Sequence, residues 1–597
     1  MSADHAPAVI CLTASGLAIA EAAAQALKGD LHGLAGRVET ALTFEEVGSH
    51  ARALFAAGRP LIGICAAGVL IRVLSPLLAD KRAEPPVLAL AEDGSSVIPL
   101  LGGHHGANAL ARLLADALGA HAAITTAGDL RFGRALDAPP PGWRLMNPSE
   151  AGPAMATALA QGAAPELERL WTKGGPRDLP LGETTLRYRP ETLAVGVGCA
   201  RGADPEAAIA LVRATLAEAE DAGAEAAVAG VFSIDLKTDE AAVHAVADAL
   251  GAPARFFDAD TLQAERHRLQ TPSERVFQEV GCHGVAEGAA LAAVGPTGRL
   301  LIAKRKTTEA TCAIAESPRP LSAAPDWPPG APRGRLTVVG VGPGAADQRT
   351  PAASRAVAEA ELLVGYGLYI DLLGALAAHK PRADFPLGGE EARCRHALEE
   401  AGRGRRVALV CSGDGGVYAM GALVLELLDR SAAAGGVSEA ARRVELVMTP
   451  GVSALQSASA RAGALLGHDF CAISLSDLLT PWETIEARVE AAARGDFVIA
   501  FYNPVSQKRR TQLARAQAIL LAHRAAETPV VLARQLGRPG EVVRRTTLAA
   551  LRIDEVDMLT TVLVGSSASR VVPSGDRAAG AQGAWVYTPR GYAAKRG

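Results

Sequence analysis

Glycine-rich loops that follow apolar strands carry the residues best suited to chemistry in this chain. The strand LTVVGVGPG ends in Gly340, Gly342, Pro343 and Gly344, where glycines allow a tight turn and the close approach of a ligand to the backbone. The pattern could be half of a dinucleotide fingerprint, but the third glycine of G-x-G-x-x-G is missing and no acidic residue ends a second strand at the right distance. Taken alone, the motif leaves a cofactor-binding loop and a plain structural turn as equal alternatives.

Short β-branched runs alternate with Ala/Leu-rich helices, and these elements must position the loops. The expected strands are Ala8–Leu12, Pro60–Cys65, Val87–Leu90, Ala122–Thr125, Leu193–Gly198, Ala226–Ser233, Leu336–Val341, Arg406–Cys411, Val444–Met448 and Phe497–Tyr502. Helices are expected at Asn108–Leu118 and Pro205–Ala222. Continuous apolar strands with intervening helices predict an α/β protein with parallel sheets covered on both faces. Such sheets bind ligands beyond the carboxyl ends of their strands.

Composition and charge narrow the class of protein. The 597 residues exceed one core and suggest roughly three to five folding units. A formal net charge of −4 gives no field for holding nucleic acid or an anionic membrane, so neither partner is expected. The eight cysteines include no C-x-x-C pair, so no zinc site is expected and reduced thiols of a cytoplasmic protein are favoured. No apolar stretch reaches the ~18 residues of a membrane helix.

Changes in composition predict where the folding units end. The segment SPRPLSAAPDWPPGAPRG, residues 317–334, is rich in proline and should be an extended linker. A weaker boundary falls between Asp137 and Pro190. The expected units are residues 1–145, 191–316 and 335–570, followed by a flexible Gly-, Ala- and Arg-rich tail at 571–597.

Five motifs after the linker resemble those of one enzyme family. They are LTVVGVGPG, VALVCSGDGGVYAM, VMTPGVSALQSASARAGALLGHDF, FVIAFYNPVSQKRR and MLTTVLVGSS. In this order they resemble the tetrapyrrole methylases. The details VGYGLYIDLL, SGDGGVYAM without the usual proline after Asp414, GHDFCAISLSDLLTPW and YNPVSQKR are similar to the branch that methylates C17 of precorrin-3B, or to its cobalt-precorrin-3 counterpart.

The resemblance implies a two-lobed class III methyltransferase fold, preceded by two smaller α/β domains, and S-adenosylmethionine as cofactor. It places at cofactor-contacting positions Pro343, Ser412, Gly413, Asp414, Val417, Ser453, Ala454, Tyr502 and Asn503. Asp414 could bond the cofactor or complement its positive charge, or it could be a turn aspartate that bonds its own loop. A homodimer through the methylase domain is also expected.

The implied substrate is a tetrapyrrole with many carboxylates, for which Arg and Lys are natural partners. The candidates are Lys508, Arg509, Arg510, Arg534, Arg538, Arg544 and Arg545. Most should be solvated charges, and one or two are expected to touch substrate. Methylation of a ring carbon with ring contraction needs an acid or base to move a hydroxyl proton. His468 and Asp469 are the candidate pair, against a purely structural role.

Two segments before the linker resemble a second family, the cobalamin biosynthesis protein that acts as cobalt-precorrin-5A hydrolase. ICAAG, LSPLLADK and LGGHHGAN carry the first resemblance, and VGVGCARGADPEAA, FSIDLKTDEAAV and ERVFQEVGCHGVAEGAAL carry the second. Gly102–Asn108 suits anion binding at a helix N-terminus, with His104 or His105 able to move protons. The alternative is a turn in which Asn108 caps the helix and the histidines are exposed.

A metal site could be built from the side chains of Ser233, Asp235, Lys237, Asp239 and Glu240. The favoured interpretation is instead the end of a strand followed by the start of a helix, so no bound metal is expected.

Three hypotheses remain for the whole chain. It is a C17-methyltransferase fused to a lactone hydrolase, or a methyltransferase with a non-catalytic module that binds or hands over tetrapyrroles. The third, a nucleotide-binding oxidoreductase, depends on the G-x-G-x-G pattern alone.

Overall fold

A computed structural model describes residues 6–78, 84–126, 129–130, 136, 139–161, 170, 177–219, 224–378, 380–506, 509–573 and 583–592. The chain forms two compact units. The first comprises Met1–Leu336, His396–Val407 and Arg430–Leu446, and the second comprises Thr337–Arg395, Ala408–Asp429 and Val447–Gly597. Within the described ranges, none of the helices has the length and apolar character needed to cross a membrane.

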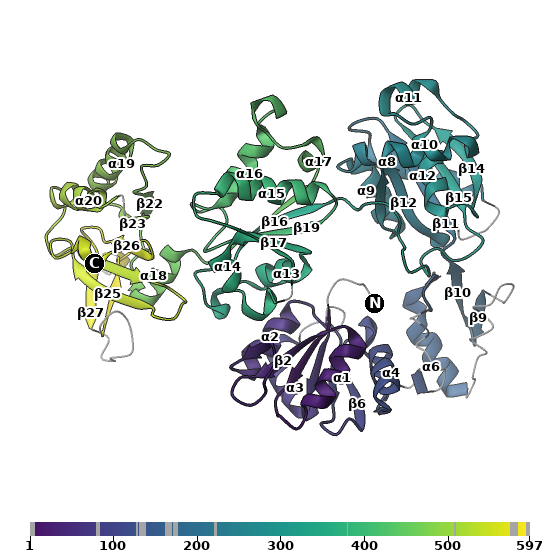
Figure 1. The fold of residues 1–597 in the computed structure, drawn as a ribbon, viewed down its shortest axis with the longest axis horizontal. Coiled ribbons are helices and arrows are strands. Elements are labelled where there is room, and N and C mark those ends of the chain that lie inside the picture. Colours follow the sequence, from purple (N-terminus) through teal and green to yellow (C-terminus); the bar gives the residue numbers. More distant parts are fainter. Residues whose placement is uncertain are drawn as a thin grey trace. The chain divides into compact units, whose positions relative to one another are not determined.

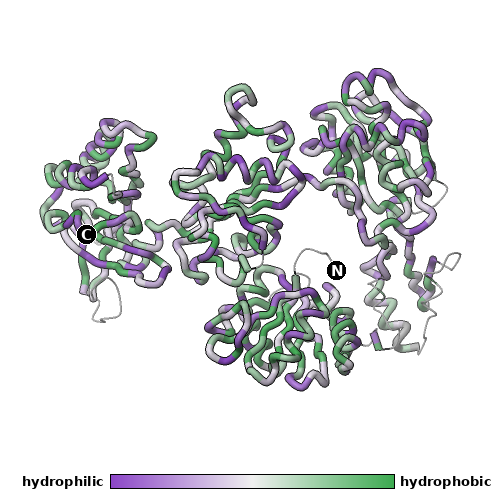
Figure 2. The backbone as a smooth tube through the Cα atoms, in the orientation of Figure 1, coloured by the Kyte–Doolittle hydropathy of each residue, from purple (hydrophilic) through white to green (hydrophobic). Residues whose placement is uncertain are grey.

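The N-terminal sheet has seven strands in the order β3-β2-β1-β4-β5-β6-β7 (Figure 1). They are β1 (Ala8–Cys11), β2 (Asp30–Leu34), β3 (Leu42–Phe44), β4 (Leu61–Ile64), β5 (Val87–Leu90), β6 (Ser96–Leu101) and β7 (His121–Ala122). Helices α1 (Leu17–Leu27) and α4 (Ala107–Leu118) cover one face, and α2 (Val47–Ala56) and α3 (Ala67–Leu74) cover the other. Because both faces are covered, the central strands are hydrophobic along their whole length (Figure 2).

A small antiparallel sheet follows, in the order β8-β10-β9. Its strands are β8 (Trp143–Leu145), β9 (Asp178–Leu181) and β10 (Thr184–Pro190), and helix α6 (Ala151–Gln161) packs on it. This element was not predicted, and it fills the interval that the sequence left as a boundary. Leu186 and Tyr188 of β10 are fully buried and form its core.

The next sheet has the order β13-β12-β11-β15-β14. Its strands are β11 (Leu193–Cys199), β12 (Val228–Ile234), β13 (Ala254–Phe257), β14 (Arg299–Lys306) and β15 (Ala310–Glu316). Helices α8 (Pro205–Ala217) and α9 (Ala241–Leu250) cover one face, and α10 (Ala259–Ala264) and α12 (Val285–Val294) cover the other. Helix α11 (Glu274–Val280) lies between α10 and α12 in sequence.

The proline-rich segment at 317–334 contains no helix or strand longer than a single bridge. It is nevertheless packed against the preceding sheet. The ring of Trp327 meets Phe232 edge to face at 5.6 Å, and Ala331 forms an isolated antiparallel bridge with Phe256. The segment is therefore an irregular strap on this sheet.

The first sheet after the strap has the order β18-β17-β19-β16-β20. Its strands are β16 (Arg335–Gly340), β17 (Leu362–Tyr366), β18 (Arg382–Phe385), β19 (Arg406–Cys411) and β20 (Glu445–Thr449). The helices that connect them are α13 (Pro351–Glu359), α14 (Gly367–Asp371), α15 (Glu390–Gly402), α16 (Met420–Asp429) and α17 (Glu439–Arg442).

The last large sheet has the order β22-β23-β26-β24-β25. Its strands are β22 (Phe470–Ser474), β23 (Val498–Tyr502), β24 (Pro529–Arg534), β25 (Val542–Thr547) and β26 (Thr560–Val564). Helices α19 (Trp482–Arg494) and α20 (Gln512–Leu521) cover one face, where Ile499 and Phe501 point. Helix α18 (Ala454–Ala462) covers the other, where Val498 and Ala500 point.

The α/β class was predicted correctly, and nine of the ten expected strands overlap observed strands over most of their length. The expected strand Ala122–Thr125 is wrong except for Ala122, because β7 covers only His121–Ala122. The sheets are also not purely parallel. Strand β5 pairs antiparallel with β6, β11 pairs antiparallel with β15, and β26 pairs antiparallel with both β23 and β24. A buried strand reads as the same apolar run in either direction, so the sequence pattern cannot distinguish the two kinds of pairing.

The predicted flexible tail at 571–597 is partly wrong. Strand β27 (Arg570–Pro573) pairs antiparallel with β28 (Ala584–Tyr587), which also pairs in parallel with β21 (Gly463–Ala464). The side chain of Val586 is fully buried against α18 and the last large sheet. Composition misled the prediction because the short amphipathic strand AWVY is flanked by Gly-, Ala- and Arg-rich sequence.

Replacement of Val586 by Ala should lower the free energy of unfolding by about 2 kcal/mol, because buried methyl groups are lost and a cavity remains. Val572→Ala on β27, where the side chain is 42% exposed, is the matched control and should have little effect. Urea unfolding of the two variants measures the difference. Equal midpoints for both would contradict the placement of β28 in the core.

Candidate functional site

A cavity of about 200 Å³ in the second unit is surrounded by loops that follow its strands. All nine residues predicted to contact a cofactor line it, namely Pro343, Ser412, Gly413, Asp414, Val417, Ser453, Ala454, Tyr502 and Asn503. Its other lining residues are Tyr369, Tyr418, Gln535, Leu536, Arg538, Met558, Leu559, Thr560 and Thr561. The structure thus brings together side chains from five separate sequence motifs.

Glycines bring three of these loops into direct contact beneath the cavity. A Cβ atom on Gly340 would lie 2.8 Å from the carbonyl oxygen of Gly413 and 2.9 Å from the amide nitrogen of Gly451. A Cβ on Gly451 would lie 2.1 Å from that same oxygen. Gly342 and Gly413 exchange two backbone hydrogen bonds, of 3.1 and 2.8 Å. These glycines allow one backbone segment to approach another closely. The sequence pattern alone could not distinguish this role from the close approach of a ligand.

Gly413 differs from the other glycines of the cavity floor. Its φ of +71° lies in the left-handed region, and a Cβ there would have Ser453 Cα, at 3.7 Å, as its only neighbour within 4 Å. Space is therefore open on the side of Gly413 that faces the cavity. A side chain at this position would be strained and would project into that space.

Asp414 ties two loops together. Its Oδ1 accepts a hydrogen bond from the amide of Gly416 at 2.8 Å, and its Oδ2 accepts one from the amide of Gly451 at 2.9 Å. Each carboxylate oxygen is thus engaged by backbone, as in the alternative of a turn aspartate. Asp414 lines the cavity, and its visible contacts are structural.

Tyr502 joins β23 to the start of α18. Its hydroxyl bonds Ser453 Oγ at 2.6 Å and accepts a hydrogen bond from the amide of Leu455 at 3.0 Å. Burial raises the pKa of Tyr502, so the phenol stays neutral at physiological pH. The next residue, Asn503, has a φ of +49° and donates from Nδ2 to Ser474 Oγ at 3.1 Å. These contacts fix the carboxyl ends of β22 and β23 at the cavity.

Nine lining residues were not predicted as cofactor contacts, and three of them carry an aromatic or cationic side chain. The ring of Tyr418 lies 5.2 Å from that of Tyr502, and its hydroxyl donates to the carbonyl of Ala472 at 2.8 Å. Tyr369 lies beneath the guanidinium of Arg538, whose Cζ is 5.8 Å from the ring centroid. Tyr369 and Tyr418 belong to the motifs VGYGLYIDLL and VALVCSGDGGVYAM, so the sequence did indicate that they lie near the site. Arg538 was only one of seven candidate cations for substrate binding.

The predicted acid–base pair lies away from this cavity. His468 and Asp469 precede β22, whereas the cavity lies beyond the other end of that strand, near Ser474. Their side chains are 52% and 80% exposed, and neither lines the cavity. His468 Nδ1 accepts a hydrogen bond from the amide of Asp469 at 2.8 Å, so the pair forms a surface turn.

The N-terminal histidines stand in a short 3-10 turn, η2 (Gly103–His105), before α4. His105 is exposed, and the side chain of His104 lies outside the described part of the chain. The alternative of Asn108 as helix cap is wrong, because α4 begins at Ala107 with Gly106 at the N-cap position. Asn108 instead donates to Thr126 and, at 2.9 Å, to the buried carboxylate of Asp129.

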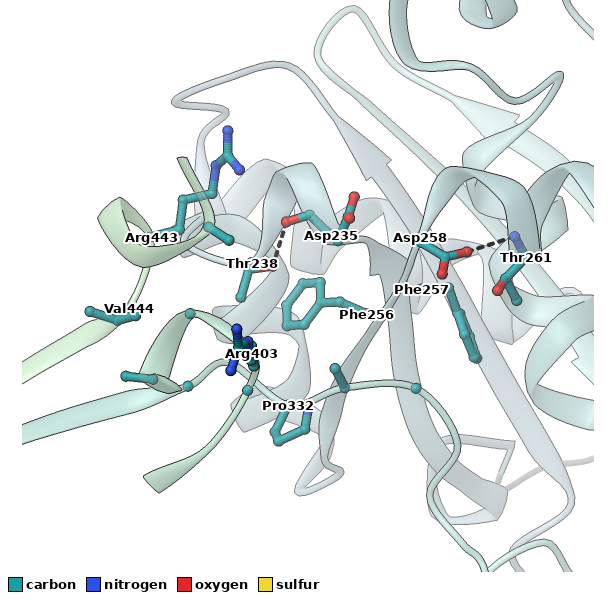
Figure 3. Close-up of a pocket in the computed structure, with 17 residues that line it drawn as sticks. Asp235, Thr238, Phe256, Phe257, Asp258, Thr261, Pro332, Arg403, Arg443 and Val444 are labelled. Atoms are coloured by element: carbon teal, nitrogen blue, oxygen red, sulfur yellow. Dashed lines mark hydrogen bonds between the residues drawn. The ribbon is translucent and has the colours of Figure 1, made fainter. Parts of the chain in front are cut away.

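A second cavity, of about 490 Å³, lies in the first unit beyond the carboxyl ends of β12 and β13 (Figure 3). Burial raises the pKa of Asp235, and Asp258 Oδ1 accepts a hydrogen bond from the amide of Thr261 at 2.7 Å to cap α10. Phe256 and Pro332 supply apolar walls. Over the described residues, no three His, Cys, Asp or Glu side chains form a group that could hold a metal ion.

Comparison with known proteins identifies the family of the region that follows the proline-rich segment. The family model "Tetrapyrrole (Corrin/Porphyrin) Methylases" matches residues 335–552. A precorrin-3B C(17)-methyltransferase of Sinorhizobium sp is 44% identical over 260 residues, which are 44% of this chain and 98% of that protein. The chain belongs to the tetrapyrrole methylase family and is an enzyme of the methyltransferase class, as its five motifs predicted.

Two further proteins resemble the same region. A cobalt-factor III methyltransferase of Priestia megaterium is 41% identical over 263 residues, 44% of this chain, and the chain spans about half, 46%, of that protein. The crystal structure of the methyltransferase CobJ matches with 39% identity and a TM-score of 0.39, over 43% of this chain and 100% of that one.

The front end matches two other family models. "Cobalamin synthesis G N-terminal" matches residues 49–129, and "Cobalamin synthesis G C-terminus" matches residues 193–315. The predicted resemblance of both segments to the cobalamin biosynthesis protein is confirmed. Methylase and cobalamin-synthesis segments therefore stand in one chain.

Replacement of Asp414 by Ala should lower the free energy of unfolding by about 2–3 kcal/mol without any ligand, because two charge-assisted hydrogen bonds to backbone are lost. Thermal and urea unfolding of the ligand-free protein test this. Asp554→Ala, which breaks an exposed ion pair with Arg552, is the control and should leave the midpoint unchanged. An unchanged midpoint in Asp414→Ala would restore a ligand-only role for this carboxylate.

Proposed function

We propose that this chain methylates C17 of precorrin-3B, or of its cobalt-containing counterpart, with ring contraction, and uses S-adenosylmethionine as the methyl donor. The observation that carries the proposal is the convergence of all nine expected cofactor positions on one cavity. The precorrin-3B C(17)-methyltransferase of Sinorhizobium sp, which is 44% identical to this chain over 98% of its own length, is named for that activity.

The cavity has the features that such a cofactor needs. When bound, S-adenosylmethionine supplies an electrophilic methyl group. Gly413 leaves open space beside a loop backbone, and the rings of Tyr418 and Tyr502 form an aromatic wall against which an adenine base can pack. Pro343 and Ala454 come from loops after different strands, so backbone groups surround the ligand on several sides.

The proposed substrate is supported by the chemistry of the cavity as well as by sequence similarity to known methyltransferases. A precursor of the corrin ring carries many carboxylates, and arginine binds such groups by paired hydrogen bonds. Arg538 is the arginine that lines the cavity among the described residues. We expect this protein to act as a homodimer in the cytoplasm, as the resemblance to the methylases implies.

Gly413→Val should weaken the binding of S-adenosylhomocysteine by about tenfold or more, because the branched side chain would fill the space beside the loop. Calorimetric titration of the full-length protein measures the affinity. The control is Gly388→Val, since Gly388 has a φ of +87° and open space around it but lies outside the cavity. Equal affinity in both variants would leave the Gly413 loop without a role in binding.

Turnover can be read by mass spectrometry. Purified protein with S-adenosylmethionine should add one methyl group to precorrin-3B or to cobalt-factor III, and comparison of the two substrates identifies the pathway. Catalytic labelling at a position other than C17, located by NMR of a labelled product, would contradict the proposed regiochemistry while retaining the methyltransferase class.

A second candidate function of the chain belongs to the residues before the proline-rich segment. It is hydrolysis of the lactone of cobalt-precorrin-5A, and the two family models that match this region favour it. Wild type should then release a two-carbon aldehyde from cobalt-precorrin-5A. A His104→Ala, His105→Ala double variant should lose this release and keep methyl transfer. Absence of release by wild type would favour the alternative, a module that binds or hands over tetrapyrroles.

A further inference from the structure

Arg538 is a half-buried cation without an acidic partner. Its Nε donates to the carbonyl of Pro343 at 2.9 Å, and its Nη2 donates to Ser412 Oγ at 3.1 Å. Among the residues that the structure describes, no carboxylate lies within ion-pair distance of its guanidinium, and no acceptor is bonded to Nη1. The two neutral contacts orient the group without neutralising it.

The backbone around Arg538 is built to hold it in the cavity. A Cβ atom on Gly344 would lie 2.6 Å from Arg538 Cγ and 2.6 Å from the carbonyl oxygen of Gly537. Gly537 has a φ of +67° and approaches the amide of Ala345 closely. The loop that carries Arg538 therefore packs directly on the G-P-G turn after β16, and this fixes where the guanidinium points.

Arg538 differs in this respect from three of the other predicted substrate cations, Arg534, Arg544 and Arg509. Arg545 has a buried Nε without a hydrogen-bond partner, but it does not line the cavity. Arg534 pairs with Asp557 at 2.6 Å, and Arg544 pairs with Glu555. Arg509 donates to Ser476 Oγ and lies 3.7 Å from Asp477. Lys508 lies outside the described residues, and Arg510 is exposed.

The arginines of the larger cavity are also neutralised. Arg403 pairs with Glu400, and Arg443 pairs with Glu439 at 3.3 Å. That cavity therefore offers no uncompensated positive charge, although it is the roomier of the two. Among the described arginines that line these two cavities, Arg538 is therefore the one without a carboxylate partner.

The surroundings of Arg538 favour an anion. Burial lowers the pKa of Arg538 from its usual value, which records the cost of holding a charge away from water without a counter-ion. The group still carries its proton, because an arginine side chain is not deprotonated in proteins. Arg538 Cζ lies over the ring of Tyr369, 5.8 Å from its centroid, and its Nε and Nη2 already bond Pro343 and Ser412. The edge that carries Nη1 is therefore left for hydrogen bonds to a carboxylate.

We propose that Arg538 is the residue of this cavity that binds a ligand carboxylate through its free guanidinium edge. The inference rests on the proposed function, because that function supplies two carboxylate sources. One is the methionine part of the cofactor, and the other is an acid side chain of the tetrapyrrole. The two sources share the same chemistry at Arg538, and binding measurements separate them.

The test uses full-length wild type, Arg538→Met, Arg538→Lys and the control Arg544→Met. Three probes are titrated against each: S-adenosylhomocysteine, 5′-methylthioadenosine, which lacks the amino-acid carboxylate, and uroporphyrin I, a tetrapyrrole with eight carboxylates. Arg538→Met should lose about ten- to hundredfold in affinity for one carboxylate-bearing probe. Arg538→Lys should recover part of the loss because it restores the charge but not the paired geometry. Arg544→Met should bind all three probes as wild type does.

The outcomes are distinct. Loss for S-adenosylhomocysteine with unchanged 5′-methylthioadenosine assigns the cofactor carboxylate, and loss for uroporphyrin I with a weaker salt dependence assigns the tetrapyrrole. Equal weakening for all three probes would mean that Arg538 only holds the loops together, and would overturn the inference. Unchanged affinities would overturn it too, with the proposed function intact. Failure of wild type to bind either S-adenosylhomocysteine or uroporphyrin I would overturn both.

Discussion

The close approach of three backbone segments under the cavity is the constraint on which the second unit depends. The carbonyl of Gly413 lies where any side chain at positions 340 or 451 would have to be. Because this oxygen and its neighbours are satisfied by backbone hydrogen bonds and by the Asp414 carboxylate, the three loops form one rigid floor. Every side chain that faces the cavity from these loops takes its direction from that floor.

The features that depend on a local sequence pattern, such as the bounds of buried strands and the loops that follow them, were predicted well. Strands such as Val87–Leu90 and Arg406–Cys411 have the expected bounds, because a buried apolar run between helices is a local signal. The cofactor positions converge because their motifs mark loops at strand ends. Pairing direction and the strand Ala584–Tyr587 escaped prediction, and the sequence pattern did not single out Arg538 from the other candidate cations. Arg534 and Arg538 look alike in sequence, and only the folded chain shows that one has a carboxylate beside it.

Polar groups in the first unit serve mainly to hold it together. The buried Asp129 carboxylate accepts hydrogen bonds from the side chains of Arg112, Asn108 and Thr126. The buried Glu287 accepts backbone hydrogen bonds from Gln270, Thr271 and Lys304, and its pKa is lowered by hydrogen bonds that outweigh the effect of burial. Such saturated carboxylates rigidify a fold, since breaking one leaves a buried charge without compensation. Chemistry in this unit has to come from groups that are less completely bonded.

The contact between Gly344 and the Gly537–Arg538 loop has a consequence for sequence divergence. The two segments are 193 residues apart in the chain, yet each occupies the volume that a side chain on the other would need. A substitution at either place is tolerated only if the other has already moved, so their effects on stability will not add. Related sequences that lack glycine at one position should carry a lengthened or shifted loop at the other, and the two should vary together as a pair.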